Sequence, residues 1–540
     1  MRPESGLLGL TLPSLAATRS IQTAATFEEK CVQFRPEASV KNSTRTELQF
    51  VKAGAHVTLS DNDPTCGTDS QAVTADVCRI AMSIPTSNQS SITYEMWLPE
   101  DWSGRFLATG NGGIGGCVGY EDLAYGTANG FATVGTNNGH NGTRGDTFYQ
   151  NDDVVADFGW RSLHTSVEVG KKLTALFYGA AVSKSYFIGC SLGGRQGIHS
   201  AEVFPDDFDG IVAGAPAVDF NNLYSSRARY FTITGEDGAQ SFITADTWKT
   251  TIHDEVRRQC DGIDGAMDGI IEDPTLCKFE PETLLCGAKK DGGDCLTDAQ
   301  VGTVNKIFSN YLWSNGSMLY PAMQPGSEIA ASSGLYNGKA YAPSVGWFKF
   351  AVLENPAWDP TTFTTDDALI AGQKDPGGIR TWPSSLAAFE GRGGKILTHH
   401  GQQDQQITSF NSIRFYEHLA SGMGYAPEQM DQFYRFFRIP GMGHCGSGPG
   451  AWVVGQAGSS AVQGIPFDRE HNVLAAVVDW VEKGLAPEAL VGTKFVNDTV
   501  GAGIAYQHTH CKYPAKSTFK GGEHNPSEVG ELGFESCRAR

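Results

Sequence analysis

The chain has 540 residues, of which 40% are apolar and 19% are charged, so it can bury a large core. By length alone it allows roughly two to four domains. It has no run of about 18–20 consecutive apolar residues, which argues against a membrane span. The formal net charge of −19 would repel phosphate backbones and anionic lipid, so we expect no nucleic-acid partner and no membrane partner.

Cysteines and glycosylation sequons indicate an oxidising, extracellular compartment. Twelve cysteines without a C-x-x-C pair favour six disulfides over a zinc or thioredoxin-type motif. N-x-S/T sequons begin at Asn42, Asn88, Asn141, Asn315 and Asn497. We therefore expect a secreted glycoprotein.

The N-terminus fits a signal peptide over residues 1–17. Arg2 precedes an apolar run at residues 7–12, and Ser14-Leu15-Ala16 fits a small-x-small cleavage site. Glu4 and Pro13 depart from that pattern. The alternative is a disordered, soluble N-terminus.

In chain order, the predicted elements alternate between strand and helix. The apolar pattern predicts strands at residues 106–109, 130–135, 186–188, 211–214, 395–400 and 433–439, and a helix over residues 163–177. Such alternation predicts a mainly parallel sheet covered by helices on both faces.

The pattern changes between about Ala217 and Ser384. This segment is rich in glycine, proline, aromatic residues and cysteine, and strand–helix alternation resumes only at Lys395. We therefore predict a catalytic domain formed by residues 18–216 and 385–540, with residues 217–384 inserted between two strands as a lid.

Residues 189–193 predict a nucleophile elbow. Gly189-Cys190-Ser191-Leu192-Gly193 fits G-x-S-x-G, with a predicted strand before it and helix-forming residues after it. In this strand–turn–helix setting a serine hydroxyl is held exposed for attack, and glycines permit the tight turn. The alternative is an ordinary glycine-rich turn.

A nucleophilic serine needs a base, and the base needs an acid that orients it. In α/β hydrolases these follow in the order Ser, then Asp or Glu, then His. Predicted strands lead into Asp404 and into the glycine-rich loop that ends at His444. We predict the triad Ser191, Asp404 and His444, with structural roles for His399 and His400. A turn-capping role is the alternative for Asp404.

Two cysteines flank this triad. Cys190 precedes Ser191, and Cys445 follows His444. If serine and histidine meet, their neighbours come within the Cα spacing of about 4.4–6.8 Å that a disulfide needs. A Cys190–Cys445 bridge would tie the base loop to the elbow; the alternative is that each cysteine pairs elsewhere.

Backbone amides are expected to form the oxyanion hole. The N–H of Leu192, which follows the serine, is the first predicted donor. The second donor is expected from the early glycine-rich loop, at Gly112 or Gly113. Of these two residues, Gly113 is the one we assign to the oxyanion hole.

Several motifs resemble the fungal tannase and feruloyl esterase family. They are the Cys-Ser, Asp and His-Cys arrangement of the triad, the early segments 97–99, 104–107 and 110–113, and the segments 204–205 and 210–216. The resemblance spans roughly Cys31 to Cys537 and is nearest to the feruloyl esterase B group. It implies an α/β-hydrolase domain with an inserted lid, and cleavage of hydroxycinnamate esters.

The resemblance also implies a structural calcium ion in the lid. Asp261, Asp264 and Asp268 would give carboxylates, and the carbonyls of Ala266 and Ile270 would complete the loop. From the residues alone, an Asp/Gly turn is the preferred interpretation, because the spacing is not that of an EF-hand.

The remaining cysteines are paired partly by proximity and partly by the resemblance. Cys260–Cys277 would staple the calcium loop, and Cys286–Cys295 are close in sequence. The family pattern implies Cys31–Cys78, Cys66–Cys117 and Cys511–Cys537.

The function expected is that of a secreted serine esterase, monomeric or homodimeric, that acts on small aromatic esters and feruloylated plant polysaccharide through an acyl-enzyme. The lid would cover the site, and its aromatic residues, most of them expected in the core, are Trp313, Tyr320, Trp347, Phe348, Phe350, Trp358 and Phe363. One alternative is a tannase acting on galloyl esters. Another is a non-catalytic secreted glycoprotein that keeps the hydrolase fold for binding.

Overall fold

The computed structural model of the chain describes residue 1 and residues 25–287, 294–458, 464–519 and 534–538. The signal peptide predicted over residues 1–17 lies outside these ranges, apart from Met1. Within them, none of the helices combines the length and the apolar character needed to cross a bilayer.

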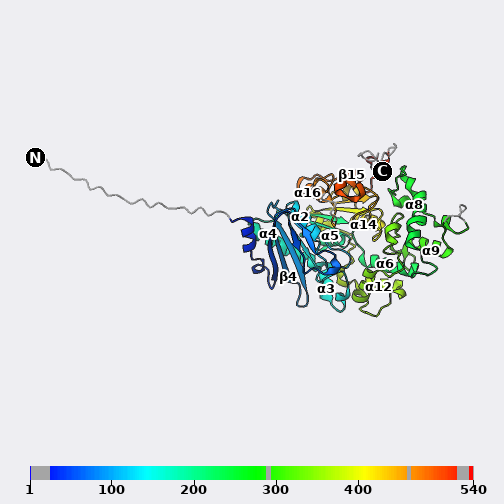
Figure 1. Cartoon of the computed structure of the whole chain (residues 1–540), viewed down its shortest axis with the longest axis horizontal. Coiled ribbons are helices and arrows are strands. Elements are labelled where there is room, and N and C mark those ends of the chain that lie inside the picture. Colours follow the sequence, from blue (N-terminus) through cyan, green and yellow to red (C-terminus); the bar gives the residue numbers. More distant parts are fainter. Residues whose placement is uncertain (2–24, 288–293, 459–463, 520–533, 539–540) are drawn as a thin grey trace.

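A nine-stranded sheet forms the centre of the molecule (Figure 1). Its strands, in spatial order, are β1 Thr44–Val51, β4 Val77–Pro85, β5 Ser91–Pro99, β7 Phe131–Thr136, β6 Arg105–Thr109, β8 Lys184–Cys190, β9 Gly210–Gly214, β12 Lys395–Gly401 and β13 Tyr434–Ile439. Neighbouring strands from β7 to β13 are parallel. Strands β1, β4 and β5 extend the sheet in antiparallel fashion, an extension that the sequence analysis did not predict.

Helices cover both faces of the sheet. On one face, the core cluster joins alternate strand residues to α4 (Ser162–Tyr178), α5 (Leu192–Val203) and α14 (Ser409–Met423). On the other face, the intervening strand residues pack with α2 (Tyr120–Ala128) and α16 (Val473–Lys483). Because both faces are buried, β7 and β13 are buried along their whole lengths. The predicted parallel sheet and the helix expected over residues 163–177 are confirmed.

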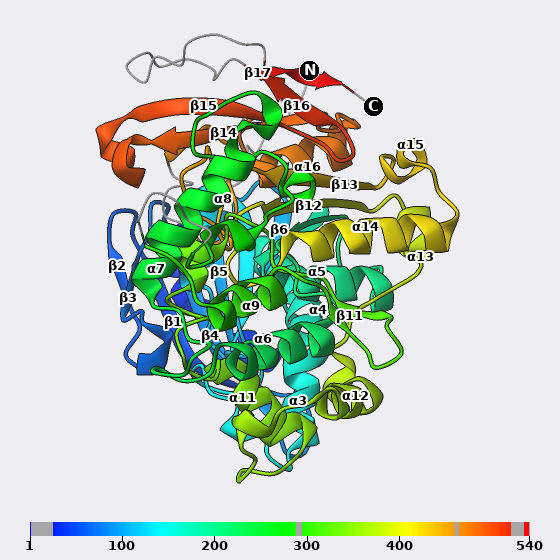
Figure 2. The same ribbon diagram turned by 90° about the vertical axis from the view of Figure 1, so that its right-hand side faces the viewer.

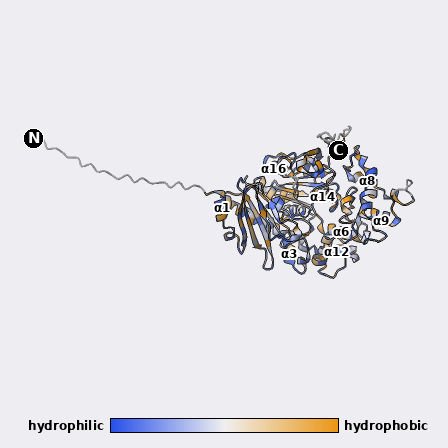
Figure 3. Cartoon of the chain, in the orientation of Figure 1, coloured by the Kyte–Doolittle hydropathy of each residue, from blue (hydrophilic) through white to orange (hydrophobic). Residues whose placement is uncertain are grey.

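The inserted segment lies between β9 and β12, which are neighbours in the sheet. Its helices are α6 Phe220–Thr234, α7 Ala245–Thr247, α8 His253–Cys260, α9 Asp298–Ile307, α10 Glu328–Ala331, α11 Ala342–Gly346, α12 Thr365–Lys374 and α13 Ala387–Gly391, and a short hairpin joins β10 Tyr311–Leu312 to β11 Met318–Tyr320. Figures 1 and 2 together show most of these helices lying across one end of the sheet. The segment has a core cluster of its own, although α8 carries mainly hydrophilic residues (Figure 3).

The two ends of this inserted segment, which is called the lid below, lie side by side. The N–H of Asp219 donates to the carbonyl of Thr381 at 3.1 Å, and that of Phe220 to the carbonyl of Arg380 at 3.1 Å. The buried Asp219 carboxylate accepts from Arg380 at 3.2 Å and from Arg414 of α14 at 2.9 Å. These contacts anchor the base of the lid to the sheet domain.

The smaller elements lie at the periphery. They are α1 Phe27–Gln33, α3 Asp152–Ala156, α15 Pro427–Met430, and the two-stranded sheets β2 His56–Thr58 with β3 Ser70–Ala72, β14 Ala489–Phe495 with β15 Ile504–Cys511, and β16 Lys516–Phe519 with β17 Phe534–Arg538. The disulfides are Cys31–Cys78, Cys66–Cys117, Cys190–Cys445, Cys260–Cys277, Cys286–Cys295 and Cys511–Cys537. All six expected pairings are therefore present.

Candidate active site

Ser191 occupies a sharp turn between β8 and α5. Its backbone has φ of 63° and ψ of −120°, a conformation that costs strain energy in an L-residue. The turn is held because the N–H of Ser191 donates to the carbonyl of Gly214 at 3.0 Å, and that of Ala217 donates to the carbonyl of Ser191 at 2.9 Å. The residue is largely buried, with 9% of its surface exposed.

Glycines make this turn possible through close backbone contacts. A Cβ atom on Gly189 would lie 2.8 Å from the carbonyl carbon of Gly193, and one on Gly110 would lie 2.6 Å from the Cα of Gly193. Larger residues would therefore push the elbow away from the strand and from the early glycine-rich loop.

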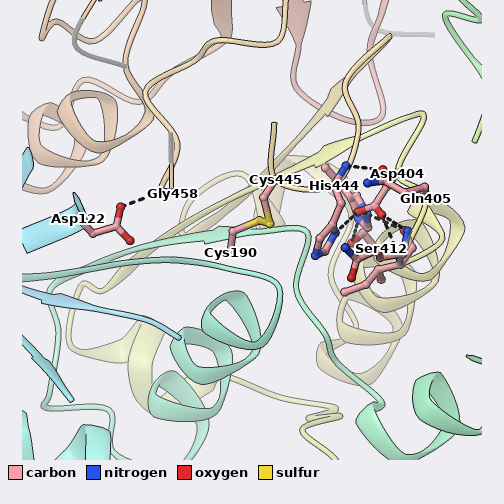
Figure 4. Close-up of a disulfide and its surroundings, with 11 residues drawn as sticks. Asp122, Cys190, Asp404, Gln405, Ser412, His444, Cys445 and Gly458 are labelled. Atoms are coloured by element: carbon pink, nitrogen blue, oxygen red, sulfur yellow. Dashed lines mark hydrogen bonds and ion pairs between the residues drawn. A yellow bond between two sulfur atoms is a disulfide. The ribbon is translucent and has the colours of Figure 1, made fainter. Parts of the chain in front are cut away.

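Asp404 and His444, the predicted acid and base, lie in contact (Figure 4). Nδ1 of His444 lies 2.7 Å from Oδ2 of Asp404, and the backbone N–H of His444 donates to Oε1 of Gln405 at 2.9 Å. Because a carboxylate only accepts, Nδ1 of His444 carries the proton in this pair, which leaves Nε2 available to act as a base. Gln405 fixes the backbone of the base loop, a role the sequence did not suggest.

Asp404 is fully buried and accepts four hydrogen bonds. Oδ1 accepts from the N–H groups of Gln406 at 2.7 Å and Ile407 at 2.8 Å. Oδ2 accepts from His444 and, at 3.0 Å, from Nε2 of His400. Burial alone would raise the pKa of Asp404, but the charge of His444 and the hydrogen bonds from both histidines hold that pKa well below its usual range. The acid therefore stays ionised.

His399 and His400 are consecutive residues of β12, but their surroundings differ. Burial lowers the pKa of His399 to about 3, so this side chain is neutral. His400 instead contacts Asp404, and its Nδ1 lies 2.7 Å from Oγ of Ser412. The predicted structural role describes the buried His399, whereas His400 also orients Asp404.

The Cys190–Cys445 disulfide joins the elbow to the base loop. It links positions 255 residues apart, with Cα atoms separated by 5.9 Å (Figure 4). The disulfide thereby holds Ser191 and His444, the residues beside these cysteines, near each other. Within the described residues no hydrogen bond joins the serine hydroxyl to the histidine ring, and such contacts often tighten only when substrate binds.

The early glycine-rich loop lies against the nucleophile helix. The N–H of Gly193 donates to the carbonyl of Asn111 at 2.8 Å, and the N–H of Asn111 donates to Oε1 of Gln196 at 3.0 Å. Leu192 is the first residue of α5, where an N–H has no partner within the helix. Gly113 has φ of +63°, and a Cβ atom there would meet only the backbone nitrogen of Gly115, at 4.0 Å. The structure thus places both predicted oxyanion donors on adjoining segments.

The lid contributes buried contacts to the acid loop. Nε2 of Gln324 donates to the carbonyl of Asp404 at 2.6 Å, and Oε1 of Gln324 accepts from the N–H of Ser409 at 3.2 Å. Nε of Arg227, on α6, donates to the carbonyl of Gln406 at 2.9 Å. The lid therefore supports the position of the triad acid.

The lid aromatics form part of a buried apolar core that includes the residue after the predicted nucleophile. Of the seven named from the sequence, Trp313 and Phe350 are half-buried and the other five are buried. One core cluster contains these rings together with Leu192, Ile114 and Phe220. The residue after the nucleophile is therefore packed against the lid.

In the loop expected to bind calcium, three carboxylates accept hydrogen bonds from backbone N–H groups of the same loop. Asp261 accepts from the N–H of Gly269 at 3.0 Å, Asp264 from Ala266 at 3.0 Å, and Asp268 from Ile270 at 3.0 Å.

Burial, with smaller effects from the charges of Asp268 and Asp261, raises the pKa of Asp264 to about 6. A bound cation would relieve this repulsion, and the oxygen donors suit a hard ion. Among the described residues, however, no three acidic, histidine or cysteine side chains are assembled as metal ligands. Carbonyl oxygens such as those of Ala266 and Ile270 would have to supply much of the coordination.

The doubly covered sheet, the strained serine at its strand–helix turn and the Asp–His pair define a hydrolase of the α/β type. Residues 77–528 match the family model described as tannase and feruloyl esterase. The chain belongs to this family.

Two relatives and one more distant structure illustrate the similarity. The chain is 53% identical over 506 residues to a probable feruloyl esterase B-2 from Aspergillus flavus, covering 94% of this chain and 97% of that protein. The crystal structure of feruloyl esterase B from Aspergillus oryzae matches with a TM-score of 0.90 and 47% identity, covering 95% of this chain and 100% of the other. Tannin acyl hydrolase from Aspergillus niger shares the fold, with a TM-score of 0.71, 21% identity and 95% coverage of both chains.

Proposed function

We propose that the chain is a serine esterase that hydrolyses hydroxycinnamoyl esters, such as feruloyl, coumaroyl and caffeoyl esters of plant cell-wall polysaccharides. One observation carries the proposal. His444 pairs with a buried, ionised Asp404, and a disulfide joins the loop that carries His444 to the Ser191 elbow. The high identity to proteins named feruloyl esterase B supports the substrate class.

The proposed reaction has two acyl-transfer steps. Nε2 of His444 takes the proton of Ser191 as the hydroxyl oxygen attacks the ester carbonyl, and Asp404 stabilises the imidazolium. The N–H groups of Leu192 and Gly113 stabilise the oxyanion. His444 then gives the proton to the leaving alcohol, which departs and leaves an acyl-enzyme. Water, deprotonated by His444, attacks the acyl carbon and releases the hydroxycinnamic acid and the free serine.

A panel of methyl esters tests the substrate class. We expect turnover of methyl ferulate, caffeate and coumarate, and little turnover of methyl gallate, since the 21% identity to tannin acyl hydrolase supports only a shared fold. The Ser191→Ala variant should lose hydrolysis while keeping its thermal unfolding midpoint. Preferred hydrolysis of gallate would replace the proposal with a tannase, and an active Ser191→Ala protein would end the mechanism.

The cellular setting and the ion complete the proposal. Secretion is supported by the six disulfides and by the exposure of all five sequon asparagines, which leaves them accessible to glycosylation. A structural calcium ion in the lid loop is supported by the oxygen donors and by the raised pKa of Asp264.

A further inference from the structure

The early glycine-rich loop, residues 110–117, lies between β6 and α2 and carries one of the two predicted oxyanion donors. An oxyanion hole stabilises developing charge only when its donors are already in place, because a donor that must first move into position loses much of its effect. Within the part of the chain that the structure describes, the N–H groups of Leu192 and Gly113 have no acceptor. Both are therefore available to a substrate oxygen, and what fixes the loop relative to α5 decides how far apart they lie.

Gln196 connects the nucleophile helix to this loop. Its side chain is 2% exposed and projects from α5, the helix that begins at Leu192. Oε1 of Gln196 accepts from the backbone N–H of Asn111 at 3.0 Å, and Nε2 donates to Oδ1 of Asn111 at 3.3 Å. The N–H of Gly193 donates in turn to the carbonyl of Asn111 at 2.8 Å. Asn111 is thus held to α5 through both of its backbone polar groups.

A second buried amide holds the loop on the other side of the candidate donors. Nε2 of Gln196 also donates to Oδ1 of Asn138 at 3.1 Å, and Nδ2 of Asn138 donates to the carbonyl of Gly115 at 3.2 Å. Oγ of Ser162, at the start of α4, donates to the same Oδ1 at 3.0 Å. All of these side chains are buried. The loop is therefore fixed both before and after Gly112 and Gly113.

The Gln196 amide is fully paired, so its loss would be felt by the loop. Oε1 has one donor, and Nε2 has two acceptors. A buried N–H that loses its acceptor is costly, which would favour a shift of Asn111 toward water. Such a shift would carry Gly113 away from Leu192. It would weaken the stabilisation of the oxyanion, which exists only in the transition state and the tetrahedral intermediate, and would leave the binding of the intact ester unchanged.

We infer that Gln196 is a positioning residue for the oxyanion hole, which fixes the spacing between the N–H of Gly113 and the N–H of Leu192. The inference rests on the proposed function, because that function takes these two groups as the oxyanion donors. It gives the helix that follows the nucleophile a second task, in addition to carrying Leu192.

Two variants and one matched control test this role. Gln196→Met keeps the length of the side chain and removes all three hydrogen bonds. Ser162→Ala is a milder change, because it removes one hydrogen bond to Asn138 from the edge of the network. The control is Ser200→Ala, which removes an equally buried hydroxyl from α5, where it donates to Oδ2 of Asp207 at 3.1 Å. Thermal unfolding shows whether each protein is folded.

Two inhibitors separate oxyanion stabilisation from substrate binding. In the first, a trifluoromethyl group replaces the methoxy group of methyl ferulate. Oγ of Ser191 adds to its carbonyl carbon, the hydroxyl proton passes to His444, and the carbonyl oxygen becomes an oxyanion held by the same donors. The second is ferulamide, which binds with its carbonyl still planar. The readouts are kcat and KM on methyl ferulate and the inhibition constant of each compound.

We expect kcat to fall roughly tenfold to hundredfold in Gln196→Met, less than the 10²–10³ typical for removal of an oxyanion donor, with KM within about twofold of the wild-type value. The inhibition constant of the ketone should rise by the same factor, while that of ferulamide stays within about twofold. Ser162→Ala should lose about threefold in kcat, and Ser200→Ala should match the wild-type protein.

The inference is overturned by a folded Gln196→Met protein with wild-type kcat, or by one that loses affinity equally for the ketone and for ferulamide. If Gln196→Met does not fold, the two serine variants decide, and equal kcat values for Ser162→Ala and Ser200→Ala overturn the inference. Failure of the wild-type protein to hydrolyse methyl ferulate would instead overturn the proposed function.

Discussion

Nε2 of His400 lies 3.0 Å from Oδ2 of Asp404, the same carboxylate oxygen that pairs with the catalytic histidine. His400 is itself held by Ser412. Since the carboxylate is oriented from two sides, its direction toward His444 does not depend on His444 alone. His400 is therefore a positioning residue of the acid loop.

Replacing this histidine should change both rate and pH dependence. In His400→Leu, loss of a charge-assisted hydrogen bond to a buried carboxylate should lower kcat roughly tenfold to hundredfold. The acid limb of the kcat/KM profile should move to higher pH, because a less neutralised Asp404 binds the imidazolium of His444 more strongly. His400→Gln, which keeps a donor, should recover part of the rate. A wild-type pH profile in His400→Leu would restrict His400 to a packing role.

Removing the Cys190–Cys445 disulfide should reduce both stability and activity. The Cys190→Ser, Cys445→Ser double variant opens a loop of 255 residues, for which chain-entropy estimates give on the order of 5 kcal/mol. The base loop also loses its tie to the elbow, so kcat on methyl ferulate should fall. The matched control removes Cys286–Cys295, which joins two lid residues only 9 positions apart. Equal effects on kcat in the two variants would contradict this explanation.

Chelation should destabilise the lid loop if it binds calcium. We expect EGTA to lower the thermal unfolding midpoint and calcium to restore it, because an ion held only by the folded state adds about 2.7 kcal/mol at a hundred times its dissociation constant. Asp264→Asn should lower the midpoint and make it insensitive to EGTA. Identical unfolding curves with and without EGTA in the wild-type protein would show that the loop needs no ion.

One buried acid, Asp122, should make a contribution to the free energy of unfolding that falls as the pH rises. Asp122 is 8% exposed, and its Oδ1 accepts from the N–H of Gly458 at 2.8 Å (Figure 4). Burial raises the pKa of Asp122 to about 7 from 3.8. The folded state therefore binds more protons than the unfolded state between these values, and the stabilisation present at low pH is lost as pH rises through about 7.

The Asp122→Asn variant, which keeps an acceptor oxygen, tests this contribution. At pH 8 it should be more stable than the wild-type protein by up to about 4 kcal/mol, and its unfolding midpoint should fall less between pH 5 and pH 8. The exposed Asp101→Asn serves as the control. Parallel midpoint curves for Asp122→Asn and the wild-type protein would rule out this source of pH dependence.

Local patterns were enough to predict the parallel strands and the loops that carry Ser191, Asp404 and His444. Each strand is a short apolar run, and each of these residues follows the carboxyl end of one. The antiparallel strands β1, β4 and β5 were not predicted, since β4 and β5 mix polar and apolar residues without a glycine-rich turn that leads into a helix.

Contacts that form only in the folded chain were out of reach. Gln324 lies 80 residues before Asp404 in an irregular part of the lid, and nothing near it in the sequence marks it as a partner of the acid loop. The signal for His400 was present, because it precedes Asp404 by four residues across a turn. The sequence nevertheless predicts only a structural role for His400, because a strand residue gives no sign of which loop atoms its ring will contact.

The junction of the lid with the sheet bears on how this family diversifies. Since β9 and β12 are adjacent, the insertion can lengthen or shorten without shifting the register of any strand. The part of the insertion that contacts the sheet domain can vary less in sequence, because Gln324 and Arg227 bind the loop that carries Asp404. Changes at the rim of the insertion should therefore alter which esters are accepted, whereas transplanting a whole lid between relatives should succeed only when these two partners travel with it.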